Sequence, residues 1–290
     1  MRIKNLELRA RVVMEGYLSG IHRSPYHGFS VEFSEYREYS QGDDTRHIDW
    51  RHYARSDRMY IKRYEDETNL RCYFLIDESR SMAFSSGEYS KAQYAATIAA
   101  TISQFIFNQG DATGLFTFDE AIQDYLPARN RPGHLRRLML ILEKQAEGRA
   151  TSLEAPLRRI ADILNKRSLL ILLSDLFTDT NNLDKQLGYL RARGHDVIVF
   201  QVLDPRELDL KFQNASLFHD LESGQDLLID PQLAQQDYKK KLDAHQAGVR
   251  KACDRLGVEY QLFTTDQPLE LALQEFVATR SHRKRPTRKK

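Results

Sequence analysis

Cysteine is scarce in this sequence: only Cys72 and Cys253 occur among 290 residues. They show neither metal-binding spacing nor a CxxC pair, which excludes a zinc ribbon, a CxxC redox centre and a disulfide-rich scaffold. Cys72 lies within an apolar, strand-like run, so we expect it to be a small buried hydrophobic side chain. The thiols therefore suggest no chemistry.

Long apolar runs are also missing. The longest near-apolar stretch, residues 169–173, is far shorter than the roughly 18 residues that a membrane-spanning helix needs. The first residues, MRIKNLELRARVV, carry scattered charges and lack the apolar core of a secretory signal. The sequence therefore favours a soluble, cytoplasmic protein.

A large excess of one charge is absent, since the formal net charge is +2. Residues 280–290 nevertheless hold seven Lys or Arg and no acid, which leaves residues 1–279 with a net charge of −5. A mildly acidic body argues against specific nucleic-acid binding. We expect the tail to be a solvated, disordered end. The alternative is a peripheral contact of the tail with anionic lipid, RNA or an acidic partner.

From residue 71 onward, strand-like and helix-like segments alternate. Residues 71–76 and 169–174 are apolar without polar alternation, as expected for strands buried on both faces. Residues 89–108 have apolar positions at helical spacing, and Gly110 then stops that helix. The pattern predicts βαβ units and a doubly wound, mostly parallel α/β sheet. The remaining predicted segments are strands at 114–118, 196–203 and 258–263 and helices at 134–146, 152–165, 182–193, 232–256 and 268–279.

Two parts of the chain depart from this alternation. Residues 1–70 contain many tyrosines and a strongly charged stretch, and we predict that they form a small β-rich N-terminal lobe. Residues 215–230 read as two short strands around a turn, which indicates a hairpin insertion at about 210–231. The predicted organisation is thus this lobe, an α/β domain at 71–279 and the basic tail at 280–290.

Three oxygen-rich loops are expected at one edge of the sheet. Asp77, Ser79 and Ser81 follow the first apolar strand, Asp175 follows the other apolar strand, and Thr151 precedes a predicted helix. Ligands of doubly wound sheets bind beyond the carboxyl ends of the strands, where strand order reverses. If these two strands flank that point, the three loops meet there. Taken alone, Asp-x-Ser-x-Ser is more often turn or capping chemistry, but the shared edge favours a ligand site.

The side chains in these loops favour a hard cation. Carboxylates, hydroxyls and water suit Mg²⁺, and also Mn²⁺ or Ca²⁺, better than zinc. With so few protein charges, the cation would stay partly unneutralised. A carboxylate from a partner could then complete its coordination, which is a binding mechanism and not a catalytic one.

The spacing Asp77-x-Ser79-x-Ser81, followed by Thr151 and Asp175, resembles the metal ion-dependent adhesion site of von Willebrand factor A domains. Residues before it resemble the N-terminal signature of the domain-of-unknown-function 58 family, and the similarity covers about residues 15–205 in unbroken order. The signature residues are Gly28-x-x-x-Glu32-Phe33, Arg37-Glu38-Tyr39, Gly42-Asp43-Asp44-x-Arg46-x-Ile48-Asp49-Trp50 and Ala54-Arg55.

This resemblance implies a von Willebrand factor A-like fold and a metal ion held directly by Ser and Thr hydroxyls, with the aspartates acting directly or through water. The family is bacterial and is commonly found beside MoxR-type AAA+ ATPases. The resemblance therefore implies an adaptor or partner of such an ATPase, acting in complex assembly or maturation.

Two departures from the family pattern bear on the metal. Arg80 places a cation beside the expected site, where it would weaken metal binding or form an ion pair with Glu78. The third loop reads Arg149-Ala150-Thr151-Ser152 where Gly-Thr-Asp is expected. The third-loop ligand is therefore either Thr151 or Ser152.

Other polar residues favour structural interpretations. Asp43 and Asp44 stand near Arg46 and are expected to form an Asp–Arg network, since arginine binds carboxylates in a bidentate manner. Trp50 is expected to be a packing anchor. Asp119 is expected to be a turn residue.

Recognised catalytic motifs are missing. The sequence contains no P-loop, no GxGxxG, no GxSxG and no HExxH. A non-catalytic, metal-dependent binding module is thus the leading prediction. The alternatives are a Mg²⁺-dependent phosphoester hydrolase, for which Glu78 is the available base, and a membrane or RNA adaptor that acts through the tail.

Overall fold

The computed structural model describes residues 5–13, 36–38, 60–62, 71–144, 153–209, 216–219, 226–229 and 231–274. The chain separates into two compact units, one formed by residues 1–23 and 70–290 and the other by residues 24–69. In the second unit, β1 (Tyr36–Glu38) pairs antiparallel with β2 (Tyr60–Lys62).

The larger unit is built on a six-stranded sheet with the order β10-β7-β6-β3-β4-β5. All neighbouring strands are parallel except β4 and β5. The strands are β3 (Arg71–Asp77), β4 (Ala112–Phe118), β5 (Ile122–Arg129), β6 (Leu169–Ser174), β7 (Asp196–Leu203) and β10 (Glu259–Thr264). The predicted doubly wound, mostly parallel α/β sheet is confirmed.

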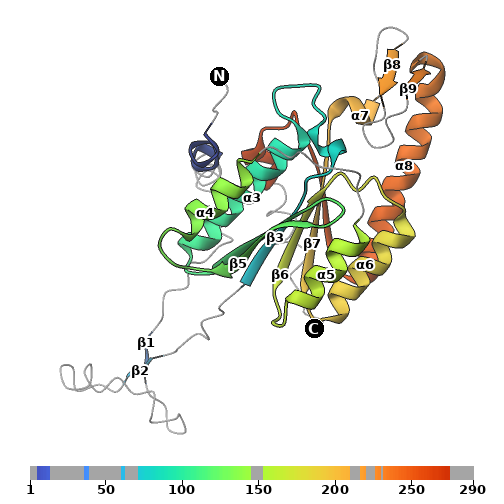
Figure 1. Ribbon diagram of the computed structural model, residues 1–290. Helices are drawn as coiled ribbons and strands as arrows, with labels where there is room; N and C mark the ends of the chain where they lie inside the picture. Colours follow the sequence, from blue (N-terminus) through green and yellow to red (C-terminus); the bar gives the residue numbers. More distant parts are fainter. Residues whose placement is uncertain are drawn as a thin grey trace. The chain divides into compact units, whose positions relative to one another are not determined.

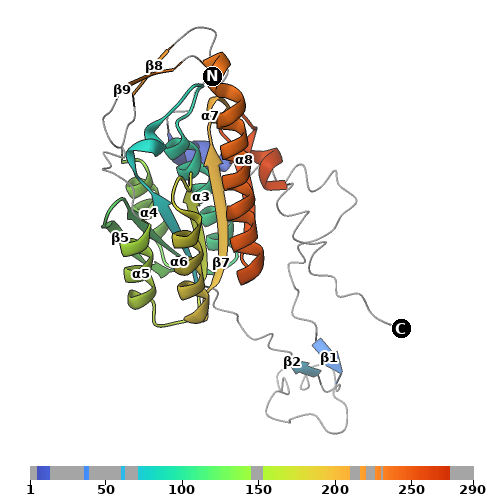
Figure 2. The same ribbon diagram turned by 90° about the vertical axis from the view of Figure 1, so that its right-hand side faces the viewer.

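Helices cover both faces of this sheet (Figure 1). One face carries α3 (Lys91–Asn108) and α4 (His134–Leu142), and the other carries α5 (Glu154–Ile163), α6 (Thr180–Ala192) and α8 (Pro231–Leu256). Figure 2 shows α6 and α8 side by side. The 3-10 helix η2 (Arg80–Ala83) and the short helix α7 (Pro205–Asp209) follow β3 and β7 at the carboxyl edge of the sheet.

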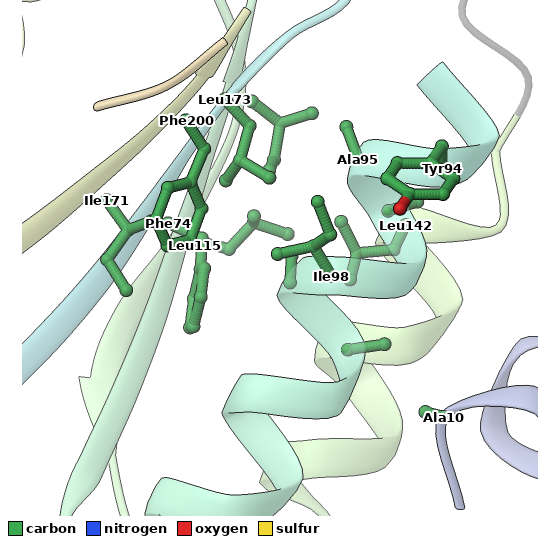
Figure 3. Close-up of a cluster of buried hydrophobic side chains, with 14 of the residues drawn as sticks. Ala10, Phe74, Tyr94, Ala95, Ile98, Leu115, Leu142, Ile171, Leu173 and Phe200 are labelled. Atoms are coloured by element: carbon green, nitrogen blue, oxygen red, sulfur yellow. The ribbon is translucent and has the colours of Figure 1, made fainter. Parts of the chain in front are cut away.

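Alternating strand residues divide the core into two layers. Phe74 and Leu173 pack toward α3 and α4, whereas Leu75 and Leu172 pack toward α5, α6 and α8. The first layer is drawn in Figure 3. Successive strand side chains point to opposite faces, so runs that are apolar at every position are buried on both sides. This burial fixes the register of the central strands, and hence the level at which each strand ends.

Local signals agree with the start and end of α3. Ser90 caps it through a reciprocal capping box with Gln93. Gly110 follows it with φ +88°, in the left-handed region that glycine adopts without steric cost. The first turn of α3 therefore begins at Lys91, beside the carboxyl edge of the sheet.

Besides the short helices η2 and α7, two elements of the larger unit were not predicted. Residues 6–13 are helical, and Leu6, Ala10 and Val13 join the same core layer as α3, so this segment of the predicted β-rich lobe is a helix of the larger unit. Strand β5 was also missed. Its alternating exposure and Pro127 fit an edge strand, where a missing backbone N–H costs no ladder hydrogen bond.

The hairpin insertion is present. Strands β8 (Ser216–His219) and β9 (Asp226–Ile229) pair antiparallel. The basic tail at 280–290 and Trp50 lie outside the described residues, and the predictions about them stay predictions.

Candidate functional site

The carboxyl ends of β3 and β6 lie side by side in the sheet. Along the chain, strands are added on one side of β3 as β4 and β5 and on the other as β6, β7 and β10, so strand order reverses between β3 and β6. The register pairs Ile76 with Leu173, which places Asp77 level with Ser174. Two of the three predicted loops therefore meet at the reversal point, as expected for a ligand site of this architecture.

Asp77 is fully buried at this edge. One carboxylate oxygen accepts a hydrogen bond of 2.9 Å from the backbone N–H of Ser79, and the other accepts one of 2.6 Å from the hydroxyl of Ser174. The first contact folds the chain back after β3, and the second joins β3 to β6. The carboxylate is therefore held by both strands that flank the reversal point.

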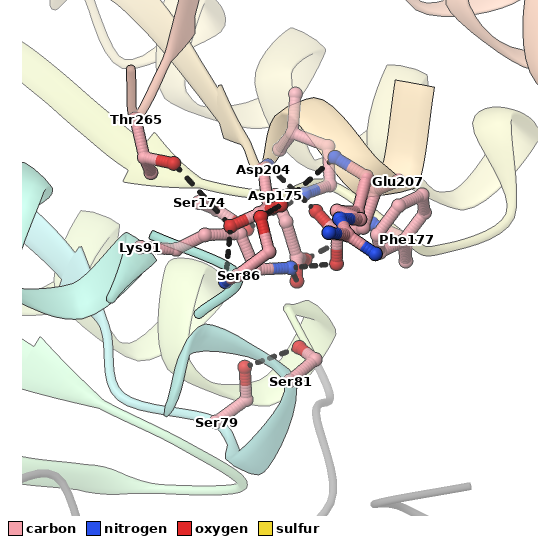
Figure 4. Close-up of polar contacts among 12 residues, drawn as sticks. Ser79, Ser81, Ser86, Lys91, Ser174, Asp175, Phe177, Asp204, Glu207 and Thr265 are labelled. Carbon is pink, nitrogen blue, oxygen red and sulfur yellow. Dashed lines mark hydrogen bonds and ion pairs between the residues drawn. The ribbon is translucent and has the colours of Figure 1, made fainter. Parts of the chain in front are cut away.

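Ser79 and Ser81 hold their hydroxyl groups together. The two oxygens are 3.1 Å apart (Figure 4), and Ser79 is fully buried. Ser79 stands at the start of η2, whose first turn is closed by the backbone N–H of Met82 donating to the carbonyl of Ser79. The turn places alternate residues on the same side, as the spacing Asp-x-Ser-x-Ser predicts.

The charge of Asp77 is poorly compensated. Burial, followed by the nearby charge of Asp175, raises the pKa of Asp77 to about 6. The buried carboxylate is therefore destabilised by missing water and by a like charge. An added cation would relieve both effects.

The donor set fits a hard divalent cation. Adjacent oxygens around an octahedral Mg²⁺ at about 2.1 Å are separated by about 3 Å, close to the observed distance between the Ser79 and Ser81 hydroxyls. Carboxylate and hydroxyl oxygens are also the ligand types that such ions prefer. Among the described residues, no three His, Cys, Asp or Glu side chains gather in a metal-binding group, so a metal here would rely on the hydroxyls.

Asp175 is also buried, and it carries its own counter-ion. The ammonium of Lys91 donates to Asp175 Oδ2 at 2.8 Å and to Glu207 Oε1 at 2.6 Å. The backbone N–H of Phe177 donates to Asp175 Oδ1 at 3.3 Å. The sequence prediction missed Lys91 and Glu207, which extend the polar cluster around Asp175.

The turn after Asp175 has unusual backbone geometry. Leu176 has a φ of +57°, a left-handed conformation that is costly for a residue with a Cβ atom. Its N–H donates to the hydroxyl of Ser174, and its carbonyl accepts from the N–H of Thr178 and contacts a ring nitrogen of His245. These contacts hold the turn that follows Asp175.

A second polar group extends from Glu207 toward the surface. The backbone N–H of Asp204 donates to Glu207, and the Asp204 carboxylate accepts from the backbone and hydroxyl of Ser86 and from Thr265. Hydrogen bonds and ion pairs therefore connect Asp175, through Lys91, to the loop between η2 and α3 (Figure 4).

The third loop is not part of the described chain. Thr151 and Ser152 both lie outside the described residues, so the choice between them stays open. The structure describes Leu153 and α5, which begins at Glu154. These positions follow directly from the predicted third-loop ligands.

The acidic neighbours of the site play different parts. The Asp119 carboxylate accepts from the N–H of Ala121 and the amide of Gln123, which confirms its expected role in a turn. The backbone N–H of Glu78 donates to the carbonyl of Phe118, and burial raises the pKa of Glu78 to about 7. Arg80 is exposed, and its expected effect on a metal stays a prediction.

The remaining sequence candidates lie away from this edge or outside the described residues. Cys72 and Cys253 are buried free thiols, and burial raises the pKa of Cys253 to about 12. A thiol with a raised pKa is a poor nucleophile. Asp43, Asp44 and Arg46 lie outside the described residues.

Comparisons with known proteins cover most of the chain. The family model described as "Protein of unknown function DUF58" matches residues 35–248. An uncharacterised protein of Mycobacterium tuberculosis is 27% identical over 283 residues, which are 96% of this chain and 88% of that protein. An uncharacterised protein of Mycobacterium avium is 32% identical over 117 residues, 40% of this chain and 68% of that protein.

Two solved structures share the fold. An aerotolerance-related membrane protein from Bacteroides fragilis aligns with a TM-score of 0.51 at 13% identity, over 72% of this chain and 99% of that one. The conserved hypothetical protein BatB from Bacteroides thetaiotaomicron aligns with a TM-score of 0.50 at 11% identity, over 73% and 99%. At these identities the likeness concerns the fold alone. Within the described ranges, no helix has the length and apolar character needed to cross a bilayer.

Proposed function

This chain belongs to the family described as protein of unknown function DUF58, and on that premise we propose that it is a non-catalytic, metal-dependent protein-binding module. Its von Willebrand factor A-like α/β fold supports a protein-interaction role. Metal dependence and the partner are the finer parts of the proposal.

The meeting of Asp77, Ser79, Ser81 and Asp175 at one edge of the sheet is the observation that carries this proposal. Asp77 and the two serine hydroxyls would hold the ion, and Asp175 would act beside them while Lys91 holds one of its oxygens. Mg²⁺ is the preferred ion, with Mn²⁺ and Ca²⁺ as alternatives, because all the candidate donors are oxygens. When bound, the ion supplies a coordination position for a carboxylate of the partner.

A MoxR-type AAA+ ATPase is the proposed partner, as the family resemblance implies. In this role the chain acts as an adaptor in complex assembly or maturation, in the cytoplasm. The chain's part is to present the ion at the carboxyl edge of the sheet on a rigid turn. The partner's part is to provide an acidic side chain that enters the edge.

The test is an affinity measurement between the purified full-length chain and a purified MoxR-type ATPase, by biolayer interferometry in Mg²⁺ and in chelator. P-loop ATPases bind Mg²⁺ themselves, so chelator sensitivity alone does not locate the ion. The informative comparison is therefore between wild type and a Ser79→Ala/Ser81→Ala variant in the same Mg²⁺ buffer. We expect the variant to bind at least about tenfold more weakly, since two ligands are removed.

Asp162→Ala is the matched control. Asp162 forms an exposed ion pair with Arg193 at the opposite edge of the sheet, and its loss should leave affinity unchanged. Equal affinity of wild type and the double serine variant, with both folded by circular dichroism, would contradict the proposal.

A Mg²⁺-dependent phosphoester hydrolase is the second candidate, and Glu78 is the observation that favours it. Its pKa of about 7 suits a general base near neutral pH. Hydrolysis of a generic aryl phosphate that disappears in both Asp77→Ala and Glu78→Gln would support this reading over the binding module.

A further inference from the structure

Lys91 is an unusual place for a positive charge. It is the first residue of α3, where the partial positive charge of a helix N-terminus disfavours a cation. It is also fully buried, which removes the water that would stabilise an ammonium. Because both the helix N-terminus and burial disfavour an ammonium, nearby negative groups must stabilise it at this position.

Two carboxylates provide this stabilisation. Asp175 and Glu207 contact the ammonium at 2.8 and 2.6 Å, and the ring of Phe177 lies 5.1 Å from the same nitrogen. Asp77, the other buried carboxylate at this edge, is held by Ser79 and Ser174 and not by the ammonium. Carboxylates therefore outnumber ammonium groups at this edge in the part of the chain that the structure describes, and a divalent cation would offset the excess of acidic groups.

The two carboxylate partners of Lys91 differ in their relation to the candidate metal. Asp175 is one of the proposed ligands, whereas Glu207 lies on α7 and is held there by the backbone N–H of Asp204. The ammonium is thus shared between a carboxylate that a metal would use and one that it would not. When the ammonium moves toward Glu207, the Asp175 carboxylate becomes available to the metal. When the ammonium moves toward Asp175, that carboxylate is no longer available.

We propose that Lys91 is a built-in competitor of the metal ion at Asp175, and that Glu207 is a positioning residue which keeps metal affinity up by drawing the ammonium away from Asp175. This inference rests on the proposed metal site. It assigns α7 a part in metal binding that the ligand motif itself does not contain.

The proposal predicts opposite effects for two substitutions. Lys91→Met removes the competing charge and should tighten metal binding by at least about tenfold, since close charges interact strongly in a buried site. Glu207→Gln leaves the ammonium with Asp175 alone and should weaken metal binding by a similar factor. A purely structural role would weaken binding in both variants.

The experiment is a Mn²⁺ titration of the metal-free, full-length chain, followed by electron paramagnetic resonance of free Mn²⁺. Wild type, Lys91→Met, Glu207→Gln and the double variant form a cycle that separates direct from coupled effects. If Glu207 acts through Lys91, Glu207→Gln should matter much less in the Lys91→Met background than in wild type. Arg167→Met, which removes an exposed cation paired with Asp196 at the amino ends of β6 and β7, is the charge control and should leave affinity unchanged.

The outcomes are distinguishable from failure of the proposed function. If wild type binds Mn²⁺ and Lys91→Met binds equally or more weakly, this inference is overturned while the metal site stands. If Glu207→Gln lowers Mn²⁺ affinity equally in wild type and in the Lys91→Met variant, the positioning role of Glu207 is overturned. If neither wild type nor Lys91→Met binds Mn²⁺, metal dependence and this inference both fail. If only Lys91→Met binds, the competitor role is supported and metal dependence of the native chain is not.

Lys91→Met leaves the buried Asp175 and the partly buried Glu207 without their ammonium, so its folding is checked first by circular dichroism with and without Mn²⁺. If it does not fold in either condition, Lys91→Gln takes its place, because the amide removes the positive charge and keeps two N–H donors for Asp175 and Glu207. Tighter Mn²⁺ binding than wild type supports the proposal, and equal or weaker binding overturns it.

Discussion

Asp77 and Asp175 are two equally buried aspartates at the same edge of the sheet, and they are held in opposite ways. Asp77 accepts hydrogen bonds from a backbone N–H and a hydroxyl, and its pKa rises to about 6 because burial and Asp175 disfavour its charge. Asp175 accepts an ammonium instead. The two carboxylates therefore differ in that, among the described side chains, only Asp175 has a cationic side chain in contact. An added metal ion therefore gains most at Asp77.

Removal of the Lys91 ammonium tests whether this cation stabilises the Asp175 carboxylate, and it should have the largest effect on stability. Lys91→Met leaves the buried Asp175 and the partly buried Glu207 without their counter-ion, and loss of one partner from a buried ion pair typically destabilises a protein by about 3–5 kcal/mol. The measurement is urea-induced unfolding of the metal-free chain at neutral pH. A loss below about 1 kcal/mol would show that the buried ion pair contributes no more than a surface pair.

The Asp77 half of the comparison predicts a pH dependence. The folded state binds a proton at Asp77 more tightly than the unfolded state, with a pKa of about 6 against 3.8. The free energy of unfolding should therefore fall by about 2 kcal/mol as pH rises from about 4 to 6, and by less than about 0.5 kcal/mol above that. Asp77→Asn should remove this slope, as measured by urea unfolding between pH 4 and 7.5.

Glu78 contributes a slope of the same sign, because burial raises its pKa to about 7. The Asp77→Asn comparison is therefore best made in a Glu78→Gln background. Saturating Mg²⁺ should also reduce the Asp77 slope, since the ion binds the charged carboxylate. An identical slope with and without the Asp77→Asn substitution would contradict the raised pKa.

Ser174 offers a smaller effect. Its hydroxyl donates to Asp77 and accepts from the N–H of Leu176, so Ser174→Ala should destabilise the chain by about 1.5–3 kcal/mol, the range for a hydrogen bond to a charged group. Ser168→Ala, which removes a hydroxyl that donates to the neutral carbonyl of Lys166, is the control and should cost about 1 kcal/mol. Equal losses in urea unfolding would contradict the importance of the charge on Asp77.

The smallest effect is expected at the exposed pair of Lys144 and Asp124. Lys144→Met should change the free energy of unfolding by less than about 1 kcal/mol, because water and salt screen surface charges. Repetition at a salt concentration of about 0.5 M should reduce the difference further, since added ions shorten the range of surface electrostatics. A large, salt-independent loss would remove the contrast between the surface pair and the buried Lys91 pair.

Sequence reasoning located the ligand loops because their signals are local. Asp77, Ser79, Ser81 and Asp175 each follow an apolar strand directly, and parallel strands bring their carboxyl ends to one edge. The doubly wound sheet was predictable for the same reason. Thr151 stays a prediction because it lies outside the described residues.

The parts that were missed depend on distant contacts. Lys91 falls in the first turn of the helix predicted at 89–108, and no local signal shows that its ammonium contacts Glu207, which is 116 positions away. Strand β5 was missed because an edge strand is half exposed and its sequence carries Pro127. The helix at 6–13 was missed because its apolar positions, Leu6, Ala10 and Val13, form a short amphipathic stripe within a charged segment.

Leu176 carries a consequence for the speed of recognition. Its left-handed backbone is costly for leucine, yet its buried side chain and its contacts with Ser174 and Thr178 hold it in place. The turn therefore loses its conformational entropy when the protein folds and not when a ligand binds, so the turn is preorganised for binding. A ligand that arrives at Asp175 meets a turn already in its final shape, so association should be limited by diffusion and orientation and not by rearrangement of this loop.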